Sequence, residues 1–371
     1  MRRTAILHFV EGLINWDKRR SGCLGRLAMA LMKGGRLGVA AIGRFIPTGA
    51  SDKHHIKSVD RFLGNGKVDL PVLWRALCAL AAHKKPRLFV LLDWTDLHHD
   101  RFETLVAAVS YGGRALPVAW ATARKGMYEK SRNKLEVSLC LVLKSLLSDG
   151  VELVVVADRG FGRASFFKAL SRAKIQYVIR IRKDVHLIQG RGKGPVGNRA
   201  VERGQTRDLL DAYYGDDARL PVRAILTFGL GSGKNVPKQP WYLVTSLGPE
   251  QLSASQVVTV YKARMRIEHN FRDHKSMRFG FQLRSVRLSS SERYDRLLAI
   301  AALAILFLVL IGAEVEHRKL HLSFRANFIK DGPRTHSLFS LGLAYVRRLA
   351  LGPPRIRRIL ACFDVVLEGM G

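Results

Sequence analysis

Two short apolar stretches, VELVVVAD at residues 151–158 and LFVLLDW at residues 88–94, each carry an aspartate at or near the carboxyl end. Neither stretch has a helical period, so both predict buried strands. The aspartates are Asp93 and Asp158. In open α/β sheets, sites form at the carboxyl edge of the strands. Asp93 and Asp158 are therefore candidate site residues.

The segments around these strands predict a sheet flanked by helices. Gly112 and Gly113 separate two strand-like segments of a hairpin, and residues 133–147 have the apolar spacing of an amphipathic helix. The predicted order is three strands, a helix, a strand, a helix and a strand, at residues 88–94, 104–111, 117–124, 133–147, 151–158, 164–173 and 176–182. By itself this pattern indicates only the α/β class.

The remaining chain predicts helical and β-rich additions. Residues 1–85 read as short basic helices with tight turns, which suit either major-groove binding or a helical cap on the core. Residues 183–252 are rich in Gly, Lys and Arg, with strand-like pieces at 222–230 and 240–246. One long helix is predicted from Ser253 and another over 291–314, before a basic, helical tail that includes RIRRIL at 355–360.

An uncharged run of 17 residues, at positions 297–313, is near the lower limit for a membrane span. No second such run exists, and the chain on both sides is strongly charged. A helix that is apolar all round is also what a buried core helix looks like. We interpret the run as a core helix and expect no membrane association.

The composition points to a polyanionic partner. The 62 Lys and Arg residues exceed the 30 Asp and Glu residues, which gives a net charge of +32. Nucleic acid is the first expectation, with a ribosomal or membrane surface as alternatives. The four cysteines are far apart, with no C-x-x-C pair, so we expect free thiols in a reducing cytoplasm and no zinc site. The N-terminus does not read as a signal peptide.

Residues 261–275, YKARMRIEHNFRDHK, carry a spaced set of polar side chains. At about 100° per residue, Tyr261, Arg264, Glu268 and Lys275 share one narrow helix face. A carboxylate can hold a hard metal ion, and cations with a hydroxyl can hold phosphate oxygens. The alternative is a solvated helix with ordinary ion pairs.

This spacing resembles the YREK signature of bacterial insertion-sequence transposases of the DDE class, most closely the insertion-sequence-four family, which moves DNA by cut and paste. FVLLDWTDL around Asp93, VVVADRGFG around Asp158 and the HIK-VDRFLGN wording near residue 60 are similar too. The resemblance implies that Asp93, Asp158 and Glu268 are the three catalytic acids. It also implies a ribonuclease-H-like core.

In that family the remaining members of the signature contact the DNA of the element's ends, which implies such a role for Tyr261, Arg264 and Lys275. Asp96 is a rival for the first acid, but Asp93 takes the strand-end position of the motif. For Asp158 the alternative is a helix N-cap.

The resemblance gives the five segments of the chain their expected roles. They are a helical DNA-end-binding domain, a first part of the catalytic core, a β-rich insertion, a second part of the core with the YREK helix, and a basic helical tail, at residues 1–85, 86–182, 183–252, 253–329 and 330–371.

Three converging carboxylates would repel one another unless a cation neutralised them. Oxygen-only ligands favour Mg²⁺, with Mn²⁺ as a substitute, and two ions about 4 Å apart suit phosphoryl transfer. No nucleotide cofactor is expected. The glycine motif at residues 192–197 reads as a flexible basic loop without a strand before it or a helix after it, and the motif at 229–235 fails the phosphate-loop spacing.

Trp241 stands in a strand-like piece of the β-rich segment. Burial in a core is the usual fate of a tryptophan. In the family that the chain resembles, a tryptophan just before an LVTS-like strand stacks on a base that is flipped out during hairpin formation. Stacking on an unpaired base contributes about 1–3 kcal/mol. The resemblance implies this role for Trp241.

The sequence thus predicts a DNA transposase that binds double-stranded DNA, at the ends of its element and at the target, as a homodimer. It would cut one strand, form and open a hairpin, and join the ends to target DNA, in the bacterial cytoplasm near the nucleoid. The alternatives are a ribonuclease-H-like nuclease without strand transfer, or a decayed transposase that binds DNA without cutting it.

Overall fold

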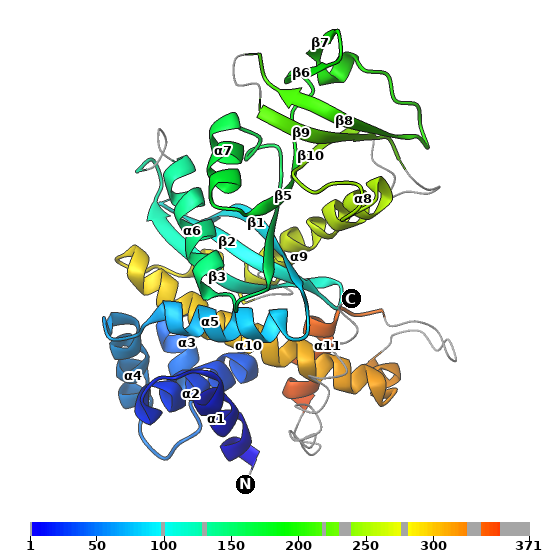
Figure 1. The fold of residues 1–371 in the computed structure, drawn as a ribbon. Coiled ribbons are helices and arrows are strands. Elements are labelled where there is room, and N and C mark those ends of the chain that lie inside the picture. The colour runs from blue at the N-terminus through cyan, green and yellow to red at the C-terminus, as the bar shows by residue number, and fades with distance from the viewer. Residues whose placement is uncertain are drawn as a thin grey trace. The chain divides into compact units, whose positions relative to one another are not determined.

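The computed structural model describes residues 2–97, 101–127, 132–216, 220–229, 239–275, 281–324 and 335–348. The chain divides into two compact units (Figure 1). Unit 1 comprises residues 1–83, 94–127 and 266–371, and unit 2 comprises residues 84–93 and 128–265. Strand β1 passes from unit 2 into unit 1 after Asp93. The units cut across the five predicted segments, whose limits stay a prediction.

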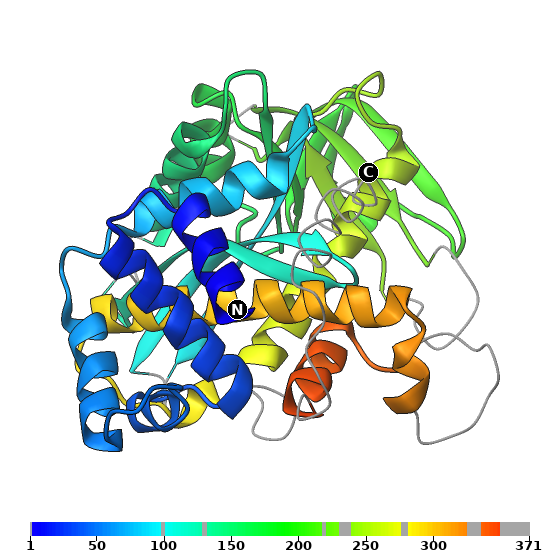
Figure 2. The ribbon, with the colours of Figure 1, turned by 90° about the horizontal axis from the view of Figure 1, so that it is seen from below.

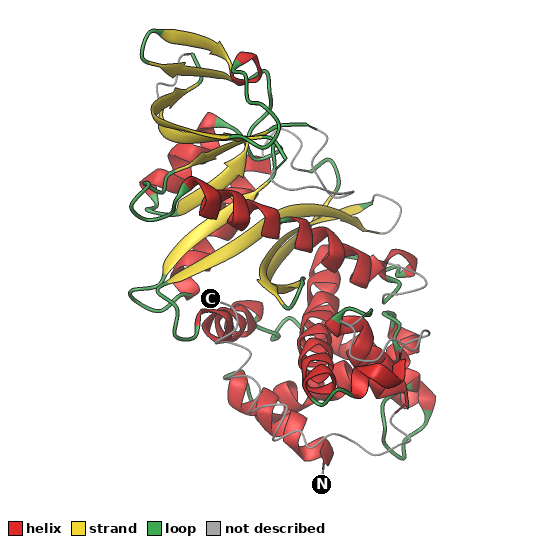
Figure 3. Cartoon of the chain, turned by 90° about the vertical axis from the view of Figure 1, so that its right-hand side faces the viewer, coloured by secondary structure: helices red, strands yellow, loops and turns green. Residues whose placement is uncertain are grey.

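Unit 2 is built on a mixed sheet, whose strands are yellow in Figure 3. Its parallel part pairs β1 with β4 and β4 with β5, and the following strands are antiparallel. The order is β1 (Arg87–Leu97), β4 (Glu152–Ala157), β5 (Gln176–Arg180), β10 (Trp241–Thr245), β9 (Leu220–Thr227), β8 (Thr206–Tyr214), β6 (His186–Gln189) and β7 (Gly192–Pro195). The α-helices among its described residues are α6 (Arg132–Leu146), α7 (Ala164–Arg172) and α8 (Ala254–Ala263), with a short 3₁₀ turn at Val196–Asn198.

The β-rich segment holds more strands than its sequence predicted. Two strands were expected, whereas the described residues contain β6, β7, β8, β9 and β10. Residues 192–195 form β7, so the prediction of a flexible loop there was wrong. Strand β10 pairs directly with β5, which continues the sheet of the parallel strands into the β-rich segment. Most of the motif at 229–235 lies outside the described residues.

Unit 1 is mainly helical, with one antiparallel hairpin. Its elements are α1 (Arg2–Leu13), α2 (Lys18–Gly34), α3 (Val39–Arg44), α4 (Asp52–Gly64), α5 (Leu70–Ala82), β2 (Phe102–Tyr111), β3 (Arg114–Arg124), α9 (Met265–Lys275), α10 (Ser291–His317) and α11 (Leu338–Arg348), with short 3₁₀ turns at Leu283–Ser285 and Leu320–Phe324. Asp17 and Asp69 cap the first turns of α2 and α5 with their carboxylates, as aspartates do at N-caps.

Helix α10 is the core of unit 1. It packs against α2, α4, α5, α11 and β3 (Figure 2). By length and composition alone it could cross a membrane, yet 94% of its most apolar 18-residue window is buried within the chain. This burial is that of a core helix, as the uncharged run predicted.

The predicted core elements are present as β1, β2, β3, α6, β4, α7 and β5. The helix predicted from Ser253 is present as two helices, α8 and α9, which divide at Arg264. The backbone of Arg264 itself keeps right-handed helical dihedral angles. The basic tail is helical at α11, whereas RIRRIL lies outside the described residues.

Candidate active site

Asp93 and Asp158 are neighbours across two parallel strands. Leu92 of β1 pairs in register with Ala157 of β4. Asp93 and Asp158 are the next residues along the two chains, so they follow this pair at the same level of the sheet. In-register residues of adjacent parallel strands point to the same face, about 5 Å apart. Strand β4 ends before Asp158, as predicted, but β1 continues past Asp93 to Leu97. Asp93 is therefore a strand residue rather than a strand end.

The carboxylate of Asp158 is held by its own loop. Its Oδ1 accepts a hydrogen bond from the Gly160 N–H at 2.8 Å. A Cβ at position 160 would lie 3.0 Å from this oxygen, so glycine leaves the room that the contact needs. The residue before α7 is Arg163, which makes no side-chain cap. Asp158 is thus not the N-cap of that helix, and the capping alternative is wrong.

Asp93 forms an ion pair with Arg264 at the break between α8 and α9. The Arg264 Nη1 lies 3.1 Å from the Asp93 Oδ2, and the two side chains are only 9% and 18% exposed. With so little water around it, this pair is stronger than a surface pair. The positive charge offsets the repulsion between two neighbouring carboxylates.

Tyr261 and Trp241 lie together next to these charges. Their rings meet edge to face, with centroids 5.1 Å apart. Burial raises the pKa of the Tyr261 phenol, opposed by the positive charges of Arg264 and Arg180. Trp241 is half-buried, so its ring is neither a fully enclosed core side chain nor a free surface one.

Arg180 is a site residue that the sequence analysis missed. Ala157 pairs with Ile179, so Arg180 continues the row that Asp93 and Asp158 begin. Its guanidinium reaches the carbonyl of Pro240 at 3.5 Å. The sequence did contain a signal for Arg180, because it is a charged residue at the end of the apolar strand QYVIR.

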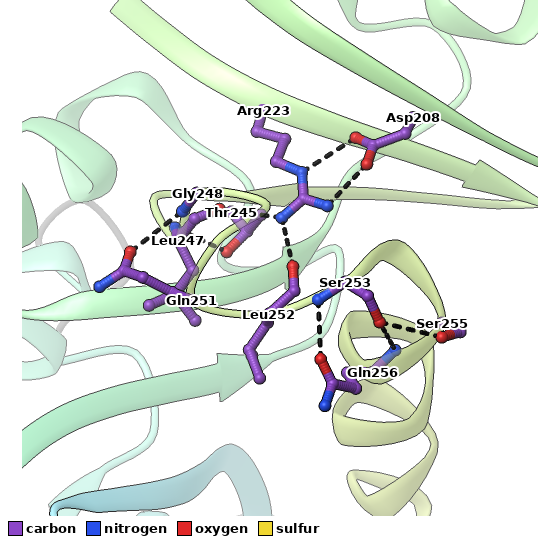
Figure 4. A network of polar contacts seen from close by, with 10 residues as sticks. All are labelled: Asp208, Arg223, Thr245, Leu247, Gly248, Gln251, Leu252, Ser253, Ser255 and Gln256. Atoms are coloured by element: carbon purple, nitrogen blue, oxygen red, sulfur yellow. Dashed lines mark hydrogen bonds and ion pairs between the residues drawn. The ribbon is translucent and has the colours of Figure 1, made fainter.

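The loop between β10 and α8 is fixed by a buried arginine (Figure 4). Arg223 on β9 donates to both carboxylate oxygens of Asp208 at 2.9 and 2.6 Å and to the carbonyl of Leu252 at 2.6 Å. Ser253 and Gln256 then form a capping box at the start of α8. These contacts set where α8 begins, and hence where Tyr261 lies.

Glu268 and Lys275 lie on α9 and belong to unit 1, whereas Asp93, Asp158, Tyr261 and Arg264 belong to unit 2. Glu268 is exposed. Lys275 is half-buried, with its Nζ 5.9 Å from the centroid of the Phe271 ring. It lines a small apolar cavity of about 20 Å³ together with Trp120. The role of these two residues at the aspartates stays a prediction.

The donor atoms at Asp93 and Asp158 fit a hard divalent cation in kind. Adjacent carboxylates supply the oxygen ligands that Mg²⁺ prefers. They are incomplete in number, because the described residues contain no group of three or more His, Cys, Asp or Glu side chains that could hold a metal ion. A third protein ligand would have to come from elsewhere, and Glu268 is the predicted one.

Residues 132–307 match the family model for the transposase DDE domain. The match covers slightly less than half of the chain and contains Asp158 and Glu268, whereas Asp93 lies before it. The match supports an enzyme of the DDE transposase type.

No curated protein matches the chain. Among the solved structures, 12 chains match. One of them is described as "Crystal structure of Aa-Ago with externally-bound siRNA", with 14% identity and a TM-score of 0.27 over 55% of this chain and 30% of that one. The chain thus spans less than a third of that protein's length, and a likeness this low supports no conclusion about fold or function.

Proposed function

From the match of residues 132–307 to the transposase DDE domain, we propose that this protein is a metal-dependent DNA transposase that cuts and joins DNA at the ends of a mobile element. The observation that carries the proposal is the pair Asp93 and Asp158, which directly follow the paired residues Leu92 and Ala157 of two adjacent parallel strands. The guanidinium of Arg264 forms an ion pair with Asp93. Side-by-side carboxylates with a cation at hand suit phosphoryl transfer.

The metal site is proposed at Asp93, Asp158 and Glu268. Mg²⁺, or Mn²⁺ in its place, would supply charge neutralisation and activate the attacking oxygen, with two ions the arrangement best suited to this chemistry. The carboxylates of the chain would hold the ions and orient the scissile phosphate. Glu268 is an exposed residue of α9.

The cationic and aromatic groups are proposed to bind DNA. Arg264, Tyr261 and Lys275 would contact phosphates of the element's ends, and Arg180 adds a guanidinium in line with the two aspartates. Arginine binds phosphate with two parallel hydrogen bonds, which fixes orientation as well as affinity. Trp241 would cover an extruded base. Its ring packs against Tyr261, and the residue is only half-buried, so part of its surface stays exposed to a base.

The proposed reaction follows cut-and-paste transposition. Water attacks phosphorus at the element's end and breaks the bond to O3′, which frees a 3′-hydroxyl. This hydroxyl attacks a phosphorus of the opposite strand, displaces the 3′-hydroxyl of the flanking DNA and forms a hairpin. A second water attacks the hairpin phosphorus and breaks its bond to O3′, which frees the 3′-hydroxyl again. This hydroxyl then attacks a phosphorus of the target DNA and releases a 3′-hydroxyl of the target strand. Each step either hydrolyses one P–O3′ bond, leaving a phosphate and a hydroxyl, or replaces one P–O3′ bond by another, so no nucleotide cofactor is consumed.

The closer identity is also part of the proposal. It comprises membership of the insertion-sequence-four family with its YREK signature, a ribonuclease-H-like core, DNA-end recognition by the N-terminal helices, a homodimer on DNA, and a place in the bacterial cytoplasm near the nucleoid. The net charge of +32 supports binding to a polyanion, and the sequence resemblance supports the rest.

Cleavage of labelled duplexes that carry the element's own ends tests the proposal. We expect Mg²⁺-dependent nicks that leave a 3′-hydroxyl, and no nicks from Asp158→Asn or Asp93→Asn, which still bind the duplex. Asp149→Asn changes an exposed aspartate near β4 and should cut like the wild type. Nicking by Asp158→Asn at the wild-type rate, or equal nicking of unrelated duplexes without joining, would contradict the proposal.

A further inference from the structure

The loop of residues 158–163, called here the Asp158 loop, is held by side chains from two other elements of unit 2. Arg163 donates from Nη1 to the carbonyl of Gly160 at 2.6 Å, and from Nη2 to the carboxylate of Glu136 on α6. Glu136 is 2% exposed, whereas Arg163 is 37% exposed. The guanidinium of Arg163 is thus a counter-ion of a buried carboxylate, and removing one partner of such a pair is costly.

A second contact holds the same loop from β8. The Tyr214 hydroxyl donates to the carbonyl of Gly162 at 2.7 Å. Its ring packs edge to face on Phe167 of α7, with centroids 4.9 Å apart. A Cβ at Gly162 would lie 3.2 Å from the carbonyl of Arg180, so the loop passes close to β5. The loop is therefore fixed at Gly160 and at Gly162 by different side chains.

These contacts lead to the carboxylate of Asp158. Glu136 orients Arg163, Arg163 holds the Gly160 carbonyl, and the N–H of the same glycine holds the Asp158 Oδ1 at 2.8 Å. This hydrogen bond engages Oδ1 and restrains the rotation of the carboxylate, so Oδ2 is the oxygen that we expect to meet a cation. Groups that orient a ligand by hydrogen bonding commonly control metal affinity.

We propose that Glu136, Arg163 and Tyr214 are positioning residues that hold the Asp158 loop so that Asp158 presents one fixed oxygen to the metal. The inference rests on the proposed function, because it takes Asp158 as a metal ligand. It adds three residues that neither the DDE acids nor the YREK signature includes. None of the three touches the reacting phosphate; each acts through the loop.

The direct test is Mn²⁺ binding to the full-length protein, measured as loss of the free Mn²⁺ signal in electron paramagnetic resonance. Glu136→Gln keeps the size of the side chain but removes the counter-ion of Arg163. We expect it to weaken Mn²⁺ binding about 10- to 100-fold, the usual effect of losing a group that orients a ligand. Tyr214→Phe loses one hydrogen bond and should have a smaller effect in the same direction.

Glu152→Gln is the matched control. Glu152 pairs with Arg87 at 2.5 Å at the other end of β1 and β4, on the same two strands as the aspartates. The same chemical change there should leave Mn²⁺ affinity at the wild-type value. Thermal unfolding of each variant identifies a variant that fails to fold, and in that case Arg163→Lys and Tyr214→Phe carry the test.

A positioning role also predicts how activity changes. Glu136→Gln should need more Mn²⁺ for half-maximal nicking, but reach nearly the wild-type rate at saturation and bind DNA equally well. The double variant Glu136→Gln with Arg163→Gln should be no weaker than the worse single variant, because the two act as one unit.

Two negative outcomes are distinguishable. Wild-type Mn²⁺ affinity in folded Glu136→Gln and Tyr214→Phe, alongside weakened binding in Asp158→Asn, would overturn the positioning inference alone. Equal binding by wild type and Asp158→Asn would instead remove the metal site and with it the proposed function.

Discussion

The carboxyl group of Asp295 lies where α10 packs on β3. Its Oδ1 accepts a hydrogen bond from the Thr122 N–H at 3.0 Å, and its carbonyl accepts one from the Trp120 indole at 3.0 Å. Burial raises the pKa of Asp295 to about 7, and Glu292 adds to the shift, while Thr122 and Arg296 oppose it. The group thus favours its neutral form in the folded chain.

Asp295 should therefore make stability depend on pH. Its pKa is about 7 folded and about 3.9 unfolded, so the folded chain binds the extra proton between these values. The contribution of Asp295 to stability is highest below pH 4, falls as the pH rises toward 7 and is constant above. Between pH 5 and pH 8 a fully buried group with this shift would lower the free energy of unfolding by about 3 kcal/mol. Because the Asp295 side chain is partly exposed, we expect a loss of about 1–3 kcal/mol.

Asp295→Asn removes this ionisation while its amide oxygen can still accept from Thr122. We expect the variant to exceed the wild type in urea midpoint at pH 8, and the difference to shrink at pH 5. The exposed Asp149→Asn serves as the control and should follow the wild type at both values. A variant that is less stable than the wild type at pH 8 would mean that the folded protein stabilises the ionised form of Asp295, and that its pKa is not raised.

Single residues were predictable where local sequence carries the signal. Asp93 and Asp158 stand out because a charge follows an uninterrupted apolar run, and the register of β1 and β4 then brings them together. Arg163 and Glu136 gave no such signal, because their partnership spans 27 positions and depends on how α6 packs beside the loop. The pairing of Arg264 with Asp93 could not be predicted either, because the two residues are 171 positions apart and meet only in the folded chain.

Helices α10 and α11 approach each other through two glycines. A Cβ at Gly342 would lie 1.9 Å from the carbonyl of Leu308, and one at Gly312 would lie 2.0 Å from that of Leu338. Such distances are far below any real contact, so side chains there would force the backbones apart. The close packing of these helices thus requires glycine at both positions, despite its low helix propensity.

Gly342→Ala should consequently destabilise the protein, although alanine favours a helix by about 1 kcal/mol. We expect a net loss of about 1–3 kcal/mol from overpacking, seen as a lower urea midpoint. Gly12→Ala in α1 is the matched control, because nothing lies within 4 Å of its added Cβ. That variant should be neutral or more stable. Equal stability gains in both would show that α10 and α11 are not in close contact.

Among the elements, long apolar runs and amphipathic helices were predictable, and breaks and short strands were not. YKARMRIEHN contains no Gly or Pro, so nothing local marks the end of α8 at Ala263. The division coincides with the burial of Arg264 against Asp93, a tertiary contact. Strand β8 escaped prediction because its alternation shifts at a bulge, where Asp211 adopts a positive φ of 54°.

For the molecule as a whole, charge is the property that the sequence alone already indicated. A net charge of +32 favours any polyanion, so charge by itself does not separate a site-specific DNA enzyme from a general nucleic-acid binder. A site-specific enzyme differs from a general binder in the few cationic side chains that contact particular phosphates of its DNA site. Those cations set the slope of log affinity against log salt, at about one unit per phosphate contact.

Lys275 provides the sharpest test of that slope. It is half-buried on α9 and belongs to the predicted end-binding set. Lys275→Ala should make the slope of log affinity against log salt shallower by about one unit for an end duplex. The change should be smaller for an unrelated duplex, because only the specific complex holds Lys275 against one phosphate. Arg87→Gln is the charge-matched control, since Arg87 is already paired with Glu152. Fluorescence anisotropy at 50–300 mM KCl, on the order of physiological ionic strength, gives both slopes. If Lys275→Ala and Arg87→Gln change the two slopes equally, Lys275 contributes only to the general positive charge of the protein. The predicted contact of Lys275 with the element's ends would then be wrong.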